Sequence, residues 1–152
     1  MKDSVIPVDR AIEDKRLLRS FSYIGGKWEA ASDGATRPVT DPASGQVVGH
    51  VAALSGAEAV AAVDAAQAAF AKWTMTLPQD RAAILRRWFD LMMEHKEDLA
   101  RIMVAEQGKP LSEARGEIDY AASFVEYYAE ETKRPNVEGV TSHLPDAEVE
   151  LW

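Results

Sequence analysis

The stretch that decides the fold is Glu106-Gln107-Gly108-Lys109-Pro110, which runs into Gly116-Glu117-Ile118-Asp119-Tyr120. Gly108 predicts the end of a helix, because glycine readily adopts the left-handed conformation that closes helices. Pro110 predicts the first turn of the next helix, where a missing N–H costs nothing. Along one side of that next helix we expect Leu111, Ile118, Ala122, Val125 and Ala129.

Two upstream motifs predict further helices. Ser55-Gly56-Ala57-Glu58 is a capping box, and it predicts a helix that runs to about Trp73. Thr76-Leu77-Pro78-Gln79 repeats this pattern, with Thr76 as the predicted cap and proline in the first turn, and this helix is expected to reach about Ala105. One stripe of the first helix holds Ala59, Ala62, Ala66, Ala69 and Trp73. The buried face of the second is predicted to be Ile84, Trp88, Leu91, Met92, Leu99, Ile102 and Met103.

The N-terminal part of the chain has a different pattern. Residues 8–20 are predicted to form a helix that acts as a loosely held arm. Tyr23-Ile24-Gly25-Gly26-Lys27-Trp28 predicts a short strand, residues 36–40 a second and residues 46–53 a third. Asp41-Pro42-Ala43-Ser44-Gly45 predicts a tight turn between the last two strands. Three short neighbouring strands indicate an antiparallel meander.

The C-terminal residues change character after Arg134. Pro135, Asn136, Gly139 and Pro145 predict a loop, and residues 147–152 alternate as a strand does. A strand without a partner exposes a full edge of hydrogen-bonding groups. We therefore expect either that the chain was cut inside an element or that another chain completes it.

The composition excludes several classes of function. The 152 residues fit one soluble domain, and the formal charge of −8 argues against a nucleic-acid partner. The chain has no cysteine, so it has no disulfide and no thiol nucleophile of its own. The first seven residues lack the apolar region of a secretory signal, and no stretch approaches a membrane span. We expect a cytoplasmic protein with no membrane partner.

Common catalytic and metal motifs are missing from the sequence. No HExxH, Gly-x-Ser-x-Gly, Gly-x-Gly-x-x-Gly or Walker A pattern occurs, and His95 is predicted to lie on the polar side of its helix. The acidic residues of the last helix are predicted to form a solvated face, with a surface pair between Glu130 and Arg134. The aromatic side chains Tyr120 and Phe124 lie one turn apart and could face either the core or an apolar channel.

Four motifs together carry a family resemblance. Tyr23-Ile24-Gly25-Gly26-Lys27-Trp28, Asp41-Pro42-Ala43-Ser44-Gly45, Arg86-Arg87-Trp88-Phe89-Asp90-Leu91-Met92-Met93 and the opening stretch occur in a fixed order. From about Leu17 to Trp152 the chain resembles the N-terminal part of the aldehyde dehydrogenase superfamily, and within it the succinate-semialdehyde branch. Asp41 stands where that family usually has Asn.

The resemblance implies an α/β fold: the N-terminal part of a Rossmann-like cofactor domain, with short antiparallel strands followed by about three long helices. Residues 1–20 would be an N-terminal arm, 21–139 part of the cofactor domain, and 140–152 the first strand of an oligomerisation β-arm. The full-length enzyme would use NAD or NADP, oxidise a small aldehyde, and form a homodimer or homotetramer through that arm.

The resemblance places the family's chemistry beyond these residues. Family members attack the aldehyde with a cysteine thiolate, stabilise the oxyanion, transfer hydride to nicotinamide and hydrolyse the thioester. No catalytic and no cofactor-binding residue of that scheme maps onto this chain. We therefore expect the chain alone to be inactive and to bind no cofactor tightly.

Two minor sites carry over by resemblance. Tyr120 and Phe124 occupy the helix that lines the family's substrate entrance, which makes them candidate channel residues. Val39, Thr40 and Glu106 match the place where some members hold a structural monovalent cation, although Glu106 could instead cap a helix or form a salt bridge.

Three hypotheses for function follow from the sequence. The first is the N-terminal segment of a dehydrogenase that acts on succinate semialdehyde. The second is a truncated, non-catalytic interaction and oligomerisation module that associates by strand addition at residues 148–152. The third is a small helical binding protein.

Overall fold

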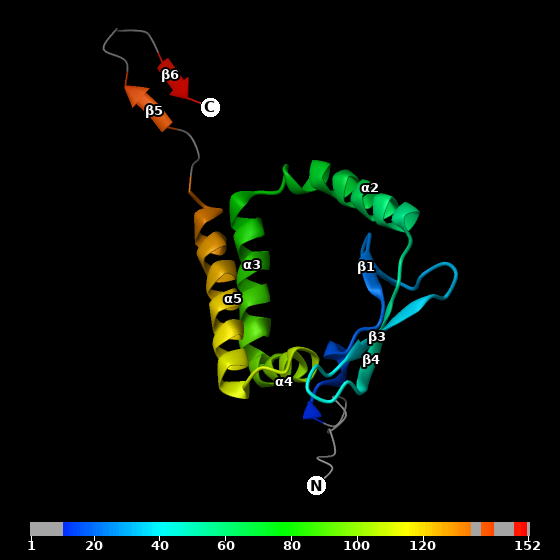
Figure 1. The fold of residues 1–152 in the computed structure, drawn as a ribbon. Coiled ribbons are helices and arrows are strands. Elements are labelled where there is room, and N and C mark those ends of the chain that lie inside the picture. Colours follow the sequence, from blue (N-terminus) through cyan, green and yellow to red (C-terminus); the bar gives the residue numbers. More distant parts are fainter. Residues whose placement is uncertain (1–10, 135–137, 142–147, 152) are drawn as a thin grey trace.

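The computed structural model describes residues 11–134, together with two strands at residues 138–141 and 148–151. Figure 1 shows short strand pairs followed by long helices, which confirms the predicted α/β class. The long helices are α2 (Gly56–Trp73), α3 (Pro78–Glu94), α4 (Lys96–Gln107) and α5 (Leu111–Glu131).

Two separate hairpins replace the predicted meander, so that prediction is wrong. Strands β1 (Ser22–Ile24) and β2 (Lys27–Glu29) pair with each other, and β3 (Thr36–Thr40) pairs with β4 (Val47–Ala52). Gly25 and Gly26 have φ of 56° and 86°. Two successive residues at positive φ reverse the chain tightly. The segment predicted as one strand is therefore a hairpin.

Ala11 is helical, but the rest of the helix predicted over residues 8–20 is wrong where the structure describes it. Only a 3₁₀ turn, η1 (Lys15–Leu17), forms over residues 12–20, and residues 8–10 lie outside the described residues. The backbone N–H groups of Glu13 and Asp14 donate to the side chain of Asp98 instead of to carbonyl groups in their own segment. A distant carboxylate thus competes with local helix formation.

The capping box at the start of α2 is confirmed. The Ser55 hydroxyl accepts from the N–H of Glu58 at 3.3 Å, and the Glu58 carboxylate accepts from the N–H of Ser55 at 2.6 Å. Glu58 also accepts from the N–H of Ser32 at 2.7 Å, so it ties the helix start to the segment between the hairpins. These hydrogen bonds lower the pKa of Glu58 to about 2, and the bond from the Ser55 backbone has the largest effect.

The second predicted helix is two helices, α3 and α4, separated at His95. His95 has φ −101° and ψ 14°, outside the helical range. The break redirects the chain, so that α4 crosses the end of α3 and α5 in Figure 1. The predicted Thr76 cap is wrong as well: Leu77 is the N-cap residue and makes no side-chain bond, while the Thr76 hydroxyl donates back to the carbonyl of Lys72.

The predicted buried face of these helices is only partly correct. Ile84 is 53% exposed and Trp88 56% exposed. Leu91, Met92, Leu99, Ile102 and Met103 are half-buried. Periodic spacing identifies an apolar face, but it does not reveal which part of that face a neighbour covers.

The core lies where α5 packs against α3 and α4. Ala100, Ala114 and Ile118 form a buried cluster, and half-buried Leu99, Met103, Val104 and Leu111 pack around it. Ile118, Ala122 and Ala129 are buried, as the spacing along α5 predicts. Alanines at these contacts allow the helix backbones to approach closely, but they bury little apolar area.

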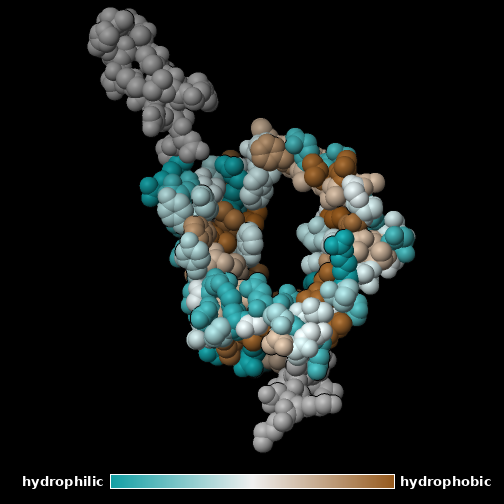
Figure 2. Space-filling model, in the orientation of Figure 1, coloured by the Kyte–Doolittle hydropathy of each residue, from teal (hydrophilic) through white to brown (hydrophobic). Residues whose placement is uncertain are grey.

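The elements form a ring around an open centre. In Figure 1 α2 and the hairpins lie across from the α3–α5 pair, and Figure 2 shows that side chains leave the middle open. No residue of α2 is buried, and Val60, Val63 and Phe70 are exposed. Apolar groups exposed on this scale are usually covered by further protein. None of the described helices combines the length and the hydropathy needed to cross a membrane.

The last strand has a partner, which corrects the expectation of an unpaired edge. Strand β5 (Glu138–Thr141) pairs antiparallel with β6 (Glu148–Leu151), in the register Glu138 to Leu151. The loop predicted after Arg134 therefore contains a strand, while its positions Pro135, Asn136 and Pro145 lie outside the described residues. In Figure 1 this hairpin lies beyond the end of α5.

Gly108 provides a test of the turn between α4 and α5. Its φ is 73°, and a Cβ there would lie 2.8 Å from Cγ of Pro42. We expect Gly108→Ala to lower the free energy of unfolding by about 1–2 kcal/mol or more, because left-handed alanine is strained and the contact is too close. Urea denaturation followed by circular dichroism measures the change.

The matched control is Gly116→Ala within α5, where a Cβ meets nothing within 4 Å. Alanine has a higher helix propensity, so this variant should gain up to about 1 kcal/mol. Equal changes in the two variants would contradict the assignment of Gly108 as the left-handed helix end.

Candidate functional site

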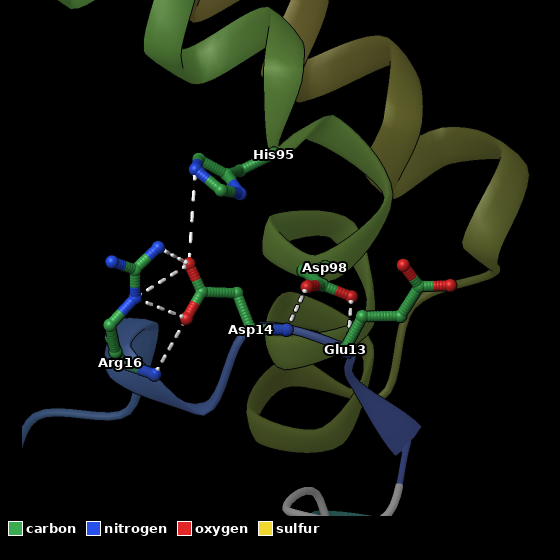
Figure 3. Close-up of polar contacts among 5 residues, drawn as sticks. All are labelled: Glu13, Asp14, Arg16, His95 and Asp98. Atoms are coloured by element: carbon green, nitrogen blue, oxygen red, sulfur yellow. Dashed lines mark hydrogen bonds and ion pairs between the residues drawn. The ribbon is translucent and has the colours of Figure 1, made fainter.

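A buried carboxylate joins the N-terminal segment to α4. Asp98 is 7% exposed, and its two oxygens accept from the backbone N–H groups of Glu13 at 2.9 Å and Asp14 at 2.8 Å (Figure 3). Asp98 lies in the first turn of α4, where the helix dipole also stabilises a negative charge. One side chain therefore satisfies two backbone donors from a segment more than 80 positions earlier.

Asp14 extends this cluster toward the surface. Its carboxylate accepts from Arg16 Nε at 2.9 Å and Nη2 at 2.8 Å, and His95 Nε2 lies 3.9 Å from Oδ2 (Figure 3). The bonds from the Arg16 side chain and backbone lower the pKa of Asp14 to about 2. The stabilisation is fully present above the ordinary pKa of 3.8 and is lost as the pH falls through about 2.

The cluster borders a recess of about 680 Å³. Glu97 also lines this recess, and its carboxylate accepts from Arg115 Nε at 2.8 Å and Nη2 at 2.9 Å and from Arg101 Nε at 3.1 Å. These hydrogen bonds, of which those from Arg115 have the largest effect, lower the pKa of Glu97 to about 2. The carboxylates of Asp14 and Glu97 are thus ionised at neutral pH, and both already accept hydrogen bonds from arginine side chains. Within residues 11–134 no group of three or more His, Asp or Glu is arranged to hold a metal ion. The geometry is that of an anchor for the N-terminal segment.

Sequence reasoning did not find this anchor. His95 was predicted to be solvated, but it is half-buried at the break between α3 and α4. The available signal was the run Glu94-His95-Lys96-Glu97-Asp98, in which acids gather as they do in a first helical turn. That signal marks a helix start, but it does not identify the distant backbone that Asp98 binds.

The acidic residues of α5 form ion pairs near the surface. Glu126 pairs with Arg86 of α3 at 2.7 Å, and Glu117 pairs with Lys109. The predicted pair between Glu130 and Arg134 is wrong, because Lys133 pairs with Glu130 at 2.8 Å and Arg134 with Glu131 at 3.0 Å. Exposed pairs of this kind contribute less than about 1 kcal/mol each.

The proposed cation residues come together in part. Val39 and Glu106 both line a recess of about 280 Å³ between residues 17–20, the β3–β4 hairpin and α4, whereas Thr40 is not among its lining residues. The pairing of β3 with β4 shifts register between Val39 and Thr40. A cation site at Val39, Thr40 and Glu106 stays a prediction.

Tyr120 and Phe124 lie on the exposed side of α5. They are 67% and 47% exposed, and their rings meet edge to face with centroids 4.8 Å apart. The core of the described residues therefore does not contain them. Their role in an entrance channel stays a prediction.

The glycines of the described residues do not form the glycine-rich turn of a Rossmann-type dinucleotide site. A Rossmann-type site needs a glycine-rich turn between a strand and the N-terminus of a helix, beside a parallel strand. Here Gly25 and Gly26 lie in a hairpin turn, Gly45 precedes β4, and Gly108 ends α4. Among the described strands each pairing is antiparallel.

Comparison with protein families gives a match that covers most of the chain. Residues 28–150 match the model described as the aldehyde dehydrogenase family. The chain is 48% identical over 135 residues to a glutarate-semialdehyde dehydrogenase of Pseudomonas putida, covering 89% of this chain and 28% of that protein. It is 47% identical to the NADP-dependent succinate-semialdehyde dehydrogenase GabD of Escherichia coli, with the same coverage.

A solved structure shows the same arrangement of elements. The succinate-semialdehyde dehydrogenase of Burkholderia pseudomallei superimposes with a TM-score of 0.85 at 48% identity, covering 92% of this chain and 29% of that one. The chain thus spans less than a third of the length of the relatives it matches.

The anchor makes a testable contribution to stability. Asp98→Ala would leave two backbone N–H groups without their acceptor, so we expect the free energy of unfolding to fall by about 1–3 kcal/mol. Asp98→Asn keeps one acceptor oxygen and should lose less. Urea denaturation gives the free energies, and hydrogen exchange should show faster exchange at Glu13 and Asp14. The matched control is Asp90→Ala, which changes an exposed aspartate on α3. An equal loss of unfolding free energy in that variant would contradict the role of Asp98 as an anchor.

Proposed function

This chain belongs to the aldehyde dehydrogenase family, and from that premise we propose that it forms the N-terminal part of an NAD(P)-dependent enzyme that oxidises a small aldehyde to the carboxylic acid. The observation that carries the proposal is the agreement of sequence and fold over about nine tenths of the chain. A cytoplasmic location is part of the proposal.

The names of the relatives support a substrate class. Glutarate semialdehyde and succinate semialdehyde, named for the two matched enzymes, each carry an aldehyde at one end and a carboxylate at the other. We infer that the longer enzyme acts on a semialdehyde of this kind, with succinate semialdehyde as the first substrate to test. The cofactor would be NAD or NADP, and E. coli GabD is named for NADP.

The catalytic thiolate of such an enzyme would come from other residues, because this chain has no cysteine. Its contribution would be structural. The apolar side chains of α2 and the open centre of the ring are surfaces that further polypeptide could cover. This arrangement supports the role of a wrap around a cofactor domain that is mostly built from the remaining two thirds or more of the enzyme.

The β5–β6 hairpin supports a proposal about assembly. An isolated two-stranded hairpin is marginally stable in water, and the outer edge of each strand pairs with no other strand that the structure describes. Pairing with another subunit would satisfy those edges. We propose that the longer enzyme is a homodimer or homotetramer and that residues 140–152 belong to the arm that joins its subunits.

A chimera tests the dehydrogenase proposal. The matched N-terminal segment of E. coli GabD is replaced by residues 17–152 of this chain, and NADP-dependent oxidation of succinate semialdehyde is followed at 340 nm. We expect activity within about tenfold of the parent, because a wrap that keeps the fold leaves the downstream chemistry in place. The 152-residue chain alone should form no NADPH.

The controls separate folding from function. A chimera carrying Gly108→Ala should lose folded protein and activity together, whereas one carrying Gly116→Ala should retain both. A soluble, folded chimera without any aldehyde-dependent NADPH formation would refute the proposed role.

The second candidate is a non-catalytic interaction module. This hypothesis cannot rest on strand addition at an unpaired terminal strand, because β6 pairs with β5. The exposed apolar face of α2, with Val60, Val63 and Phe70, favours association instead. If the chain acts alone, sedimentation velocity should show concentration-dependent self-association that Val63→Asp weakens.

The matched control for that experiment is Val47→Asp, which changes an exposed valine on β4. It should leave the self-association unchanged. A strictly monomeric chain at all concentrations would count against the interaction module.

A further inference from the structure

Two arginines in the described part of the chain are half-buried, and they differ in one respect. Arg115 on α5 donates to the Glu97 carboxylate through Nε at 2.8 Å and Nη2 at 2.9 Å. Arg81 on α3 has no carboxylate of residues 11–134 within ion-pair distance. The two guanidinium groups thus have comparable burial but different charge compensation.

The Nε–H of Arg81 is buried and has no acceptor among the described residues. A guanidinium stays charged at any physiological pH. A planar guanidinium holds an oxyanion through two parallel N–H···O bonds, which are stronger than bonds to a neutral acceptor. Because no carboxylate of residues 11–134 lies within ion-pair distance of Arg81, its guanidinium can hold one from outside these residues.

A recess of about 440 Å³ adjoins Arg81 between α3 and the end of α5. Tyr127 and Tyr128 line it, with their rings edge to face and centroids 5.3 Å apart, and both side chains are exposed. Their hydroxyl groups can donate hydrogen bonds. Thr132, also in the lining, already donates its hydroxyl to the carbonyl of Tyr128 at 2.7 Å.

Glu131 limits the charge of a ligand in this recess. It lines the recess and pairs with Arg134 at 3.0 Å. A second negative charge beside it would be repelled more strongly than a first. The recess therefore suits a singly charged, planar carboxylate better than a doubly charged phosphate.

We propose that Arg81, with Tyr127 and Tyr128, binds the carboxylate of a small acid in this recess. The part of the guanidinium that lines the recess donates to the carboxylate, and the tyrosine hydroxyls supply further donors. This site does not depend on the dehydrogenase proposal, because it rests on the recess and on the absence of an ion-pair partner for Arg81 among residues 11–134.

Nuclear magnetic resonance of the 152-residue chain tests the site. Sodium acetate is titrated at constant ionic strength, and the Nε–Hε signal of each arginine is followed. The Arg81 signal should move saturably. Arg87, an exposed arginine on the same helix, is the matched control and should not move. Sodium phosphate at equal ionic strength should shift Arg81 less than acetate does.

Two variants complete the test, each checked for an unchanged circular dichroism spectrum. In Arg81→Lys, which keeps the charge but not the fork, the backbone amide of Thr132 should lose its saturable response to acetate. The double variant Tyr127→Phe, Tyr128→Phe should raise the dissociation constant for acetate several-fold. It tests the site if the lysine variant does not fold. An equal, non-saturating shift of Arg81 and Arg87, or a response to phosphate as strong as that to acetate, would overturn the proposal.

Discussion

The packing of α5 against both α3 and α4 is the interaction on which the other described elements depend. The buried cluster of Ala100, Ala114 and Ile118 holds α4 against α5, and Gly108 permits the sharp reversal that places these two helices in contact. The close contact between Gly108 and Pro42 then fixes the β3–β4 hairpin beside this turn. The ring in Figure 1 is closed at this corner.

That core is small for a chain of 152 residues. No large side chain is fully buried within the described residues, while many large apolar side chains are exposed. Burying apolar area is the main source of folding free energy, about 25 cal/mol per Å², so alanine contacts contribute little. The small core, the open centre and the coverage of less than a third of each relative agree with a segment that packs on further polypeptide.

Three carboxylates add polar connections between the parts of this ring. Glu58 ties α2 to the segment between the hairpins, Asp98 ties the N-terminal segment to α4, and Glu97 ties α4 to α5. Each accepts from more than one donor, so loss of a single carboxylate would leave several groups without a partner. Arg81 is the reverse case, a half-buried cation without a carboxylate partner among residues 11–134.

The sequence by itself determined the family, the capped start of α2, the helix end at Gly108 and the buried strip of α5. These follow from local rules: a capping box, a left-handed glycine and helical spacing. Tertiary structure alone decided the break at His95, the end of helical structure after Ala11 and the exposure of Trp88, Tyr120 and Phe124. Beyond Ala11 the carboxylate of Asp98 accepts from the backbone N–H groups of Glu13 and Asp14. Spacing along the chain does not encode which distant group makes such a contact or which surface stays uncovered.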